Sequence, residues 1–384
     1  MQNFSYHNPV TLVFGKGTIN RLADLVPRDV TVLLLYGGGS IRANGVYDQV
    51  RAALGDRPVV EFGGIEANPH YETCMRAVAQ IRIAAAGFIL AVGGGSVLDA
   101  AKFIAAATCY TATEDPWDFM GNAQPILDAL PLGAVLTLPA TGSEMNVNSV
   151  ISREETQEKL SFGSPHVYPR FSILDPETTF TLPPRQTANG VVDAFVHVME
   201  QYMTFPCDAP LQDRQAEAVL LTLVEEGPKA LAKPRDYAVR ANLMWCATQA
   251  LNGLIGCGVP QDWASHMIGH ELTALYGIDH AQSLALVLPA LWRYELARKR
   301  AKLVQFGARV WGIVEGSDDE RAAAAIDRTE AFFRSLGVGT TLADYKIPAQ
   351  ASRIVAERLA ARGMLLGEHG DLGPDAVAAI LAAC

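Results

Sequence analysis

The sequence predicts a two-domain protein, with a doubly wound α/β domain over residues 1–182 and an all-helical bundle domain over residues 183–384. Three observations predict it. Short apolar runs alternate with helical patterns in the first half, strand patterns almost disappear in the second half, and Pro183 and Pro184 mark the change. With 384 residues, 49% of them apolar and 19% charged, the chain is long enough for two hydrophobic cores.

The predicted strands of the first domain are short apolar runs, most of which stop at glycines or prolines. They lie within residues 31–40, 58–64, 87–96, 133–144 and 171–176. Helical patterns separate the first of them, at residues 46–54, 72–86 and 97–108. Strands that are apolar throughout are buried on both faces. We therefore expect a mostly parallel, Rossmann-like sheet covered by helices on both sides.

The second domain is predicted to consist almost entirely of helices. The helical patterns cover residues 186–203, 211–232, 237–255, 263–277, 283–313 and 319–337. The tail after Gly363 is rich in glycine and alanine and has the weakest pattern. Several long amphipathic or buried helices in succession indicate a helical bundle.

The overall charge and the termini limit the partners and the compartment. A formal net charge of −10 without a basic stripe argues against nucleic acid and anionic membrane surfaces. The first residues lack the basic flank and apolar run of a signal peptide, and no run reaches the roughly 18 to 20 apolar residues of a membrane span. None of the six cysteines forms a Cys-x-x-Cys pair, so we expect a cytoplasmic protein.

Two glycine-rich turns follow predicted strands and are candidates for a nucleotide site. The turn at residues 93–96 precedes a helix, whose first N–H groups suit a phosphate. It is neither a G-x-G-x-x-G motif, because Leu98 occupies the third glycine position, nor a Walker A loop. A plain tight turn would have the same sequence. Two such turns at strand ends in one sheet favour a nucleotide.

The other turn, "YGGGSIR", contains no carboxylate that would hold ribose hydroxyls and repel a 2′-phosphate. It offers the hydroxyl of Ser40 and the guanidinium of Arg42, which suit a 2′-phosphate and therefore NADP(H). The alternative is a surface hairpin with an incidental arginine. A third segment, "TLPATGSE", supplies Thr137, Thr141 and Ser143, whose hydroxyls could bind a ligand or satisfy a turn.

Histidines and one aspartate are arranged as a metal site would need them. Asp193 and His197 share one face of an apolar helix, where a buried carboxylate requires a cation or several donors. His266 and His270 are also four residues apart, Gly277 can end their helix, and His280 follows just beyond it. Carboxylate and imidazole ligands from two buried helices suit a divalent metal. A hydrogen-bonded Asp–His pair is the simpler alternative for the first helix.

Two hydrolase motifs are excluded. The segment "GHELTALYG" resembles a zinc protease motif, but Ala274 stands where the second histidine would be. The sequence also lacks a Gly-x-Ser-x-Gly nucleophile elbow.

Over nearly its whole length the chain resembles the iron-containing, or group III, alcohol dehydrogenase family, in particular its NADPH-dependent aldehyde reductases. The motifs that carry the resemblance are "LVFGKG", "YGGGS", "FGGIEANP", "LAVGGGSVLDAAKFIA", "TLPATGSE", "LPPRQTANGVVDAFVH", "QALNGLIGCGVPQDWASHMIGHELTA" and "DHAQSLALVLPALW". The resemblance implies a dehydroquinate synthase-like architecture, a homodimer and an aldehyde or alcohol substrate. Arg42 is a departure, because relatives often carry lysine there.

The resemblance also implies roles for individual residues. It makes Asp193, His197, His266 and His280 the ligands of one divalent metal, Fe²⁺, Zn²⁺ or Mn²⁺. It places His270 near the nicotinamide, and His270 and Asp99 are the candidate catalytic residues. The implied cofactor-binding residues, to which our interpretation adds Arg42, are Gly38, Gly39, Ser40, Asn68, Gly94, Gly95, Ser96, Asp99, Thr137, Thr141, Asn146, Lys159 and Leu182.

The predicted function is hydride transfer between NADPH and a short- to medium-chain aldehyde, with the metal as a Lewis acid. The alternative enzyme is an NAD-dependent metal cyclase of the dehydroquinate synthase type. Such a site needs several basic residues for an acidic substrate, whereas Trp263, Met267 and Phe195 surround the predicted ligands. A noncatalytic nucleotide-binding protein would leave the buried aspartate and histidines without a role.

Overall fold

Parallel strands form the central sheet of the α/β unit in the computed structural model, which describes residues 1–113 and 115–384. The strand order is β1-β8-β5-β4-β2-β3. The bounds are Thr11–Phe14 for β1, Val32–Tyr36 for β2, Val59–Phe62 for β3, Phe88–Gly94 for β4, Leu132–Leu138 for β5 and Phe171–Leu174 for β8. All pairs in this sheet are parallel, as the apolar strand patterns predicted.

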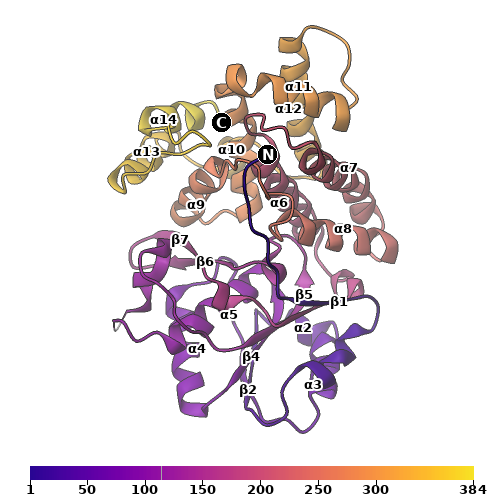
Figure 1. The fold of residues 1–384 in the computed structure, drawn as a ribbon, viewed down its shortest axis with the longest axis vertical. Helices are drawn as coiled ribbons and strands as arrows, with labels where there is room; N and C mark the ends of the chain where they lie inside the picture. Colours follow the sequence, from indigo (N-terminus) through magenta and orange to yellow (C-terminus); the bar gives the residue numbers. More distant parts are fainter. Residues whose placement is uncertain (114) are drawn as a thin grey trace. The chain divides into compact units, whose positions relative to one another are not determined.

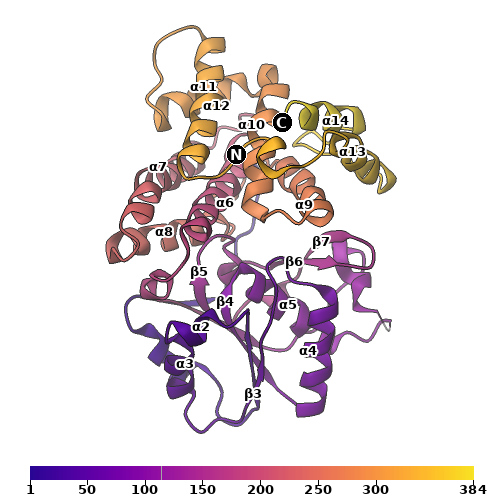
Figure 2. The ribbon, with the colours of Figure 1, turned by 180° about the vertical axis from the view of Figure 1, so that it is seen from behind.

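Alternate residues of the strands enter two different cores. Leu34 of β2 belongs to a core that includes Val50 of helix α3. Its neighbour Leu35 belongs to the core that contains Val78 and Ile104 of helices α4 and α5. The bounds are Val46–Leu54 for α3, Tyr71–Ala84 for α4 and Gly95–Cys109 for α5. The sheet is therefore covered on both faces, which confirms the doubly wound prediction (Figures 1 and 2).

The order in which the chain adds strands to the sheet reverses between β2 and β4: β3 lies beyond β2, whereas β5 and β8 lie beyond β4. Strands β2 and β4 are neighbours, but β2 leads to α3 on one face and β4 leads to α5 on the other. In open α/β sheets, ligands bind at the carboxyl ends of the strands at such a reversal. Both glycine-rich turns follow these two strands directly. The topology thus brings the two candidate nucleotide turns to adjacent positions.

Two strand features were absent from the sequence prediction. One is the short edge strand β1, and the other is an antiparallel hairpin formed by β6, Asn148–Arg153, and β7, Glu158–Gly163. The hairpin is only half buried and has charged residues at its turn, so it lacks the continuous apolar run of the other strands. It carries Lys159, one of the predicted cofactor residues.

The helical unit comprises Met1–Tyr6, Pro183–Lys233 and Gln249–Cys384, and the remaining described residues form the α/β unit. Its helices are α6 Pro184–Tyr202, α7 Pro210–Ala232, α9 Ala264–Tyr276, α10 His280–Tyr294, α11 Leu296–Val310, α12 Asp318–Ser335, α13 Ala351–Ala361 and α14 Pro374–Ala382. In the described residues beyond Leu174, no further strand forms, as predicted. The single helical pattern predicted over residues 283–313 corresponds to two helices, because α10 ends at Tyr294 and α11 begins at Leu296.

The remaining helices are short, apart from α8, whose residues are divided between the two units. They are α1 Leu22–Leu25, α2 Ser40–Ala43, α8 Tyr237–Ala250, and the 3₁₀ turns Thr18–Arg21, Pro116–Asn122, Ser143–Met145, Pro165–Val167, Pro176–Thr179 and Ala343–Tyr345. Most of α8 belongs to the α/β unit, which includes Pro234–Thr248. The domain boundary between residues 182 and 183 remains a prediction. Each compact unit also includes one segment from the other side of this boundary, Met1–Tyr6 in the helical unit and Pro234–Thr248 in the α/β unit. Among the described helices, none is both long and apolar enough to cross a membrane.

Candidate metal centre and cofactor loops

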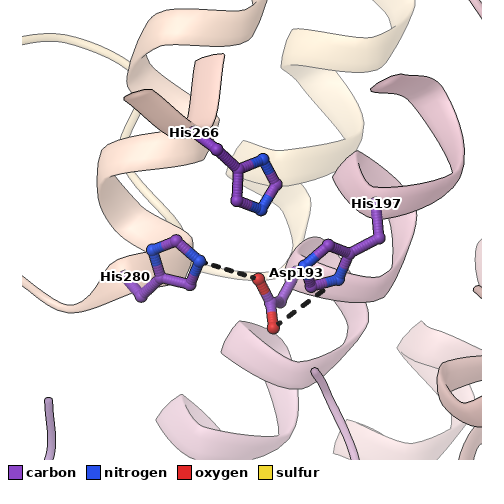
Figure 3. A group of neighbouring side chains, drawn as sticks. All are labelled: Asp193, His197, His266 and His280. Atoms are coloured by element: carbon purple, nitrogen blue, oxygen red, sulfur yellow. Dashed lines mark ion pairs between the residues drawn. The ribbon is translucent and has the colours of Figure 1, made fainter. Parts of the chain in front are cut away.

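Four side chains from three helices converge in the helical unit. Asp193 and His197 lie on α6, His266 on α9 and His280 on α10. Each offers a ligand atom, and these atoms all lie within 4.8 Å of one another. In Figure 3 the rings of His280 and His197 lie on opposite sides of the Asp193 carboxylate, and His266 lies above it. These are the four residues that the sequence assigned to a metal.

Helix α6 is buried along nearly its whole length, which explains why its polar residues need partners. Asp193 and His197 are one helical turn apart, and their side chains are 4% and 5% exposed. Their nearest polar atoms, Asp193 Oδ2 and His197 Nδ1, are 3.9 Å apart, which is too long for a hydrogen bond. The simple Asp–His hydrogen-bonded pair is therefore not what the structure shows.

His280 is the first residue of α10, whereas the sequence interpretation placed it in the segment after α9. Gly277 ends α9 in the left-handed conformation, as predicted. Asp279 then starts α10 with a capping box, in which Gln282 Oε1 accepts a bond from Asp279 N at 3.2 Å. Asn189 on α6 donates to Asp279 Oδ2 at 2.7 Å. The position of His280 is thus held by a helix start tied to α6.

His266 is held by a carboxylate that the sequence interpretation did not name. Glu200, on α6, contacts His266 Nδ1 through Oε2, and His266 N donates to Glu200 Oε1 at 3.3 Å. Burial raises the pKa of the Glu200 carboxyl well above its usual range, and Asp262 adds to this effect. Glu200 follows His197 by three residues on the same helix, which was the available sequence signal.

The donor set fits a divalent metal. Within the described residues, Asp193 Oδ1 is buried and accepts no hydrogen bond, and its distance to His280 Nε2 is 3.6 Å. A buried carboxylate oxygen without donors is costly unless a cation neutralises it. One oxygen and three imidazole nitrogens are ligands that Fe²⁺, Zn²⁺ and Mn²⁺ accept.

His270 lies beside this cluster but is not one of its four members. Its ring centroid is 5.4 Å from that of His280 and 6.2 Å from that of His266. The side chain is 5% exposed and lies one turn after His266 on α9. The structure therefore separates the three histidines of this segment into two candidate ligands and one neighbour.

In the α/β unit, the turn between β4 and α5 is packed too closely for side chains. A Cβ atom at Gly95 would lie 2.5 Å from Thr141 Oγ1, and one at Gly94 would lie 2.9 Å from the Leu138 Cβ. The glycines thus let α5 begin directly against the segment that follows β5. The N-cap residue of α5 is Gly94, which has no side chain to compete with an anion for the N–H groups of the first turn.

Three predicted cofactor residues form a connected group beside this turn. Asn68, in the left-handed conformation, donates from its backbone to Ser96 Oγ at 3.3 Å. Its side-chain oxygen accepts from Lys159 Nζ at 2.8 Å. The structure therefore brings together residues from β7, from the loop before α4 and from the start of α5.

Asp99 and Asn146 belong to a buried network around a lysine that the sequence interpretation missed. Lys102 Nζ donates to Ser143 Oγ at 2.8 Å, to Asn146 Oδ1 at 3.0 Å and to the Asn148 carbonyl at 2.7 Å. Burial lowers the pKa of Lys102 to about 8, although the carboxylates of Asp99 and Glu144 oppose the shift. A lysine in the apolar pattern "DAAKFIAAA" was the signal.

Both carboxylate oxygens of Asp99 are occupied by protein donors. Oδ1 accepts from Ser143 Oγ at 2.6 Å, and Oδ2 accepts from Val150 N at 3.0 Å. Burial raises the pKa of Asp99, whereas Lys102 and Ser143 lower it. These bonds hold the segment after β5 against α5. The predicted catalytic role of Asp99 remains a prediction.

The turn after β2 differs from the sequence interpretation in one respect. It contains no acid, but Glu61 of β3 reaches it, and Arg42 Nη2 donates to Glu61 Oε2 at 2.5 Å. The Arg42 guanidinium also lies over the Tyr47 ring, 4.1 Å from its centroid. Strand pairing thus brings a carboxylate of β3 to the Arg42 side chain, a partner that the sequence interpretation did not consider. Gly38, Ser40 and Arg42 are all exposed.

The other predicted cofactor residues lie at the end of β5 or follow β5 and β8 in the chain. Thr137 is buried near the end of β5, and Thr141 Oγ1 accepts from Ser143 N at 3.2 Å. Leu182 is half-buried and is the last residue of the α/β segment before α6. Their contacts with a cofactor remain predictions.

Protein-family models match the chain in two parts. A model described as iron-containing alcohol dehydrogenase matches residues 9–176, and the model of the C-terminal part of the Fe-containing alcohol dehydrogenase family matches residues 187–384. The chain belongs to the iron-containing alcohol dehydrogenase family. The resemblance inferred from the motifs is thereby confirmed.

Two relatives align with the chain over all or nearly all of its length. The NADPH-dependent aldehyde reductase YqhD of Escherichia coli (strain K12) is 58% identical over 377 residues, which cover 98% of this chain and 97% of YqhD. The probable NADH-dependent butanol dehydrogenase 1 of Bacillus subtilis (strain 168) is 43% identical over 388 residues, with complete coverage of both chains.

Solved structures of the family agree with the fold. The crystal structure of E. coli K-12 YqhD has a TM-score of 0.98 at 56% identity and covers 100% of this chain and 99% of that chain. The NADH-dependent butanol dehydrogenase A from Thermotoga maritima has a TM-score of 0.95 at 37% identity, with 100% and 98% coverage. The protein is an oxidoreductase of this family, and the cyclase alternative is not favoured.

Proposed function

We propose that this protein is a metal-dependent aldehyde reductase that uses NADPH to reduce short- to medium-chain aldehydes and, in reverse, oxidises primary alcohols. The observation that carries the proposal is the convergence of one carboxylate and three imidazoles in the helical unit of an alcohol dehydrogenase family member. The 58% identity to an NADPH-dependent aldehyde reductase supports the same reaction and cofactor.

The reaction consumes one aldehyde, one NADPH and one proton and yields a primary alcohol and NADP⁺. A divalent metal, when bound, supplies a Lewis acid for the carbonyl oxygen, and the cofactor supplies the hydride for the carbonyl carbon. Asp193, His197, His266 and His280 hold the metal in this proposal, with Fe²⁺, Zn²⁺ and Mn²⁺ as candidates. His270 holds the proton that reaches the alcohol oxygen, directly or through water.

The α/β unit binds the cofactor in this proposal. The N–H groups at the start of α5 face the pyrophosphate, and Ser96, Asn68 and Lys159 hold one side of the nucleotide. Asp99, through Ser143, and Lys102, through Asn146, order the segment after β5. Ser40 and Arg42 contact the 2′-phosphate, which favours NADPH over NADH. A cytoplasmic homodimer, predicted from the sequence, completes the proposal.

The division of roles among the histidines provides the test. His280→Ala and Asp193→Asn are expected to lose metal and aldehyde reduction together, because each removes one of four ligands. His270→Phe is expected to keep its metal and to lose rate by about 10²-fold or more, because it removes only the proton donor. Metal content is measured by mass spectrometry, and activity by NADPH consumption with butanal.

The comparison of the two histidine variants decides the assignment. If His270→Phe were metal-free while His280→Ala kept a full complement, their roles would have to be exchanged. Full metal in both His280→Ala and Asp193→Asn would contradict the proposed ligand set.

A further inference from the structure

One face of α6 carries more than the two candidate ligands. Asn189, Asp193, His197 and Glu200 follow one another at intervals of about one helical turn, so they lie on one side of the helix. The first of them bonds Asp279, next to His280, and the last contacts His266. Helix α6 thus contacts both segments that supply the other two histidines.

Glu200 is placed to control the His266 ring. Its side chain is 2% exposed. One carboxyl oxygen accepts from the His266 backbone N–H, and the other contacts His266 Nδ1. A metal takes the lone pair of Nε2, so the neutral ring of a metal-bound His266 carries its proton on Nδ1, from which it donates to the Glu200 carboxylate. The neutral ring then carries its lone pair on Nε2, which is the nitrogen left for the other members of the cluster.

The Glu200 segment is anchored independently of the ring. The Glu200 carbonyl accepts from Asp262 N at 2.8 Å. Asp262 Oδ2 in turn accepts from Lys299 Nζ at 2.9 Å, and Lys299 also donates to Glu368 at 3.2 Å. One backbone hydrogen bond and two buried ion pairs thus link α6, α11 and the segment before α14. The carboxylate therefore has a rigid support, as an orienting residue requires.

We propose that Glu200 is a positioning residue of the metal centre, where it fixes the tautomer and the orientation of His266 so that Nε2 faces the metal. The proposal rests on the proposed function, because it requires the four-residue metal site. It assigns a role to a carboxylate that is itself not a ligand. Orienting partners of this kind typically change metal affinity by about 10- to 100-fold when removed.

The test measures metal binding rather than turnover. Apoprotein is titrated with Zn²⁺ against a chromophoric chelator, and the absorption bands of the Co²⁺-substituted protein are recorded. Glu200→Leu is expected to weaken Zn²⁺ binding by about 10- to 100-fold. Glu200→Gln keeps the size and an acceptor oxygen but loses the charge. It is expected to weaken binding by about threefold to tenfold and to shift the Co²⁺ bands.

Glu217→Gln is the matched control. Glu217 is also a buried carboxylate, but it lies on α7 and accepts from Tyr202 and Arg309, outside the metal cluster. Its variant is expected to change Zn²⁺ affinity by less than about twofold and to leave the Co²⁺ bands unshifted. This control shows whether the loss of any buried carboxylate disturbs the helical unit. If Glu200→Leu does not fold, Glu200→Gln carries the comparison.

His266→Ala separates this inference from the proposed function. If His266→Ala loses Zn²⁺ affinity while both Glu200 variants bind like the parent, only the positioning role is overturned. If His266→Ala binds Zn²⁺ as tightly as the parent, the metal centre is misassigned and both proposals fail. An equal loss in Glu217→Gln and Glu200→Gln would also reject the specific role of Glu200.

Discussion

The proposed preference for NADPH depends on single residues in the turn after β2. A Cβ at Gly38 would meet no atom within 4 Å, so a side chain fits there. Gly39 has a φ of 97°, a conformation that a residue with a side chain adopts only with strain. Gly38 is therefore the position at which a carboxylate can be introduced without disturbing the backbone.

Gly38→Asp is expected to lower kcat/KM for NADPH about tenfold more than for NADH, since the new carboxylate repels the 2′-phosphate. Steady-state kinetics with both cofactors measure the ratio. Gly38→Asn is the control, because it adds nearly the same volume without charge. A parent enzyme with equal kcat/KM for both cofactors would contradict the NADPH proposal, as would equal effects of the two substitutions.

Lys102 is a residue whose burial has a consequence for stability. The ammonium is fully buried and its pKa is about 8, below the ordinary 10.5. In the unfolded chain the lysine keeps its proton up to its ordinary pKa, so between pH 8 and 10.5 the unfolded state binds more protons than the folded state. The free energy of unfolding therefore gains a contribution from Lys102 as the pH rises through this window.

Lys102→Met is expected to lower the free energy of unfolding by about 3 kcal/mol at pH 7, because Asp99 and Asn146 lose a buried partner. The deficit relative to the parent is expected to grow by about 2 kcal/mol between pH 7 and pH 10, since only the parent gains the titration contribution. Urea unfolding followed by tryptophan fluorescence measures both values. The exposed Lys233→Met is the control, and a deficit that shrinks with pH would reject this interpretation.

At the scale of elements, the start of one helix sets the position of a candidate metal ligand. Helix α10 starts at His280, so this candidate ligand lies in the first turn, where helices fray. The capping box of Asp279 and the bond from Asn189 hold that turn. A helix cap in this position acts on the geometry of a ligand as well as on stability.

Asp279→Ala is expected to lower the free energy of unfolding by about 1 kcal/mol. It is also expected to weaken Zn²⁺ binding by about fivefold, because about 1 kcal/mol of the binding energy is then used to order the first turn of α10. Thermal unfolding of the apoprotein and Zn²⁺ titration measure the two effects.

The matched control is Ser317→Ala at the start of α12. Ser317 forms the same kind of capping box, with Glu320, but α12 supplies none of the four candidate ligands. Its substitution should cost a similar stability and leave Zn²⁺ affinity unchanged. If both variants weakened Zn²⁺ binding equally, the cap of α10 would have no special relation to the metal centre.

At the scale of the whole molecule, the two compact units do not follow the order of the sequence. The helical unit includes Met1–Tyr6 from the start of the chain, and the α/β unit includes Pro234–Thr248 from the second half. Met244 lies in a core of the α/β unit, and Thr248 Oγ1 donates to Glu144 at 2.5 Å. The sequence pattern of α8 resembles that of the bundle helices, but most of α8 belongs to the α/β unit, because its residues pack against residues of that unit.

The sequence by itself determined the elements and the kinds of chemistry. Apolar runs ending at glycines predicted the strands that carry both turns, and four-residue spacing on apolar helices predicted that Asp193 and His197 would share a face. These are local patterns, which depend on residues within a few positions of one another. The family motifs added the remaining ligands.

Only the tertiary structure decided which charged groups are partners. Arg42 of α2 donates to Glu61 of β3, Lys102 of α5 donates to Asn146 in the segment after β5, and His266 of α9 contacts Glu200 of α6. The members of these pairs are separated by 19, 44 and 66 positions in the chain. Strand register and helix packing bring them together, and neither is set by local periodicity. For this reason the sequence predicted the four candidate ligands, whereas the contact of His266 with the Glu200 carboxylate emerged only from the fold.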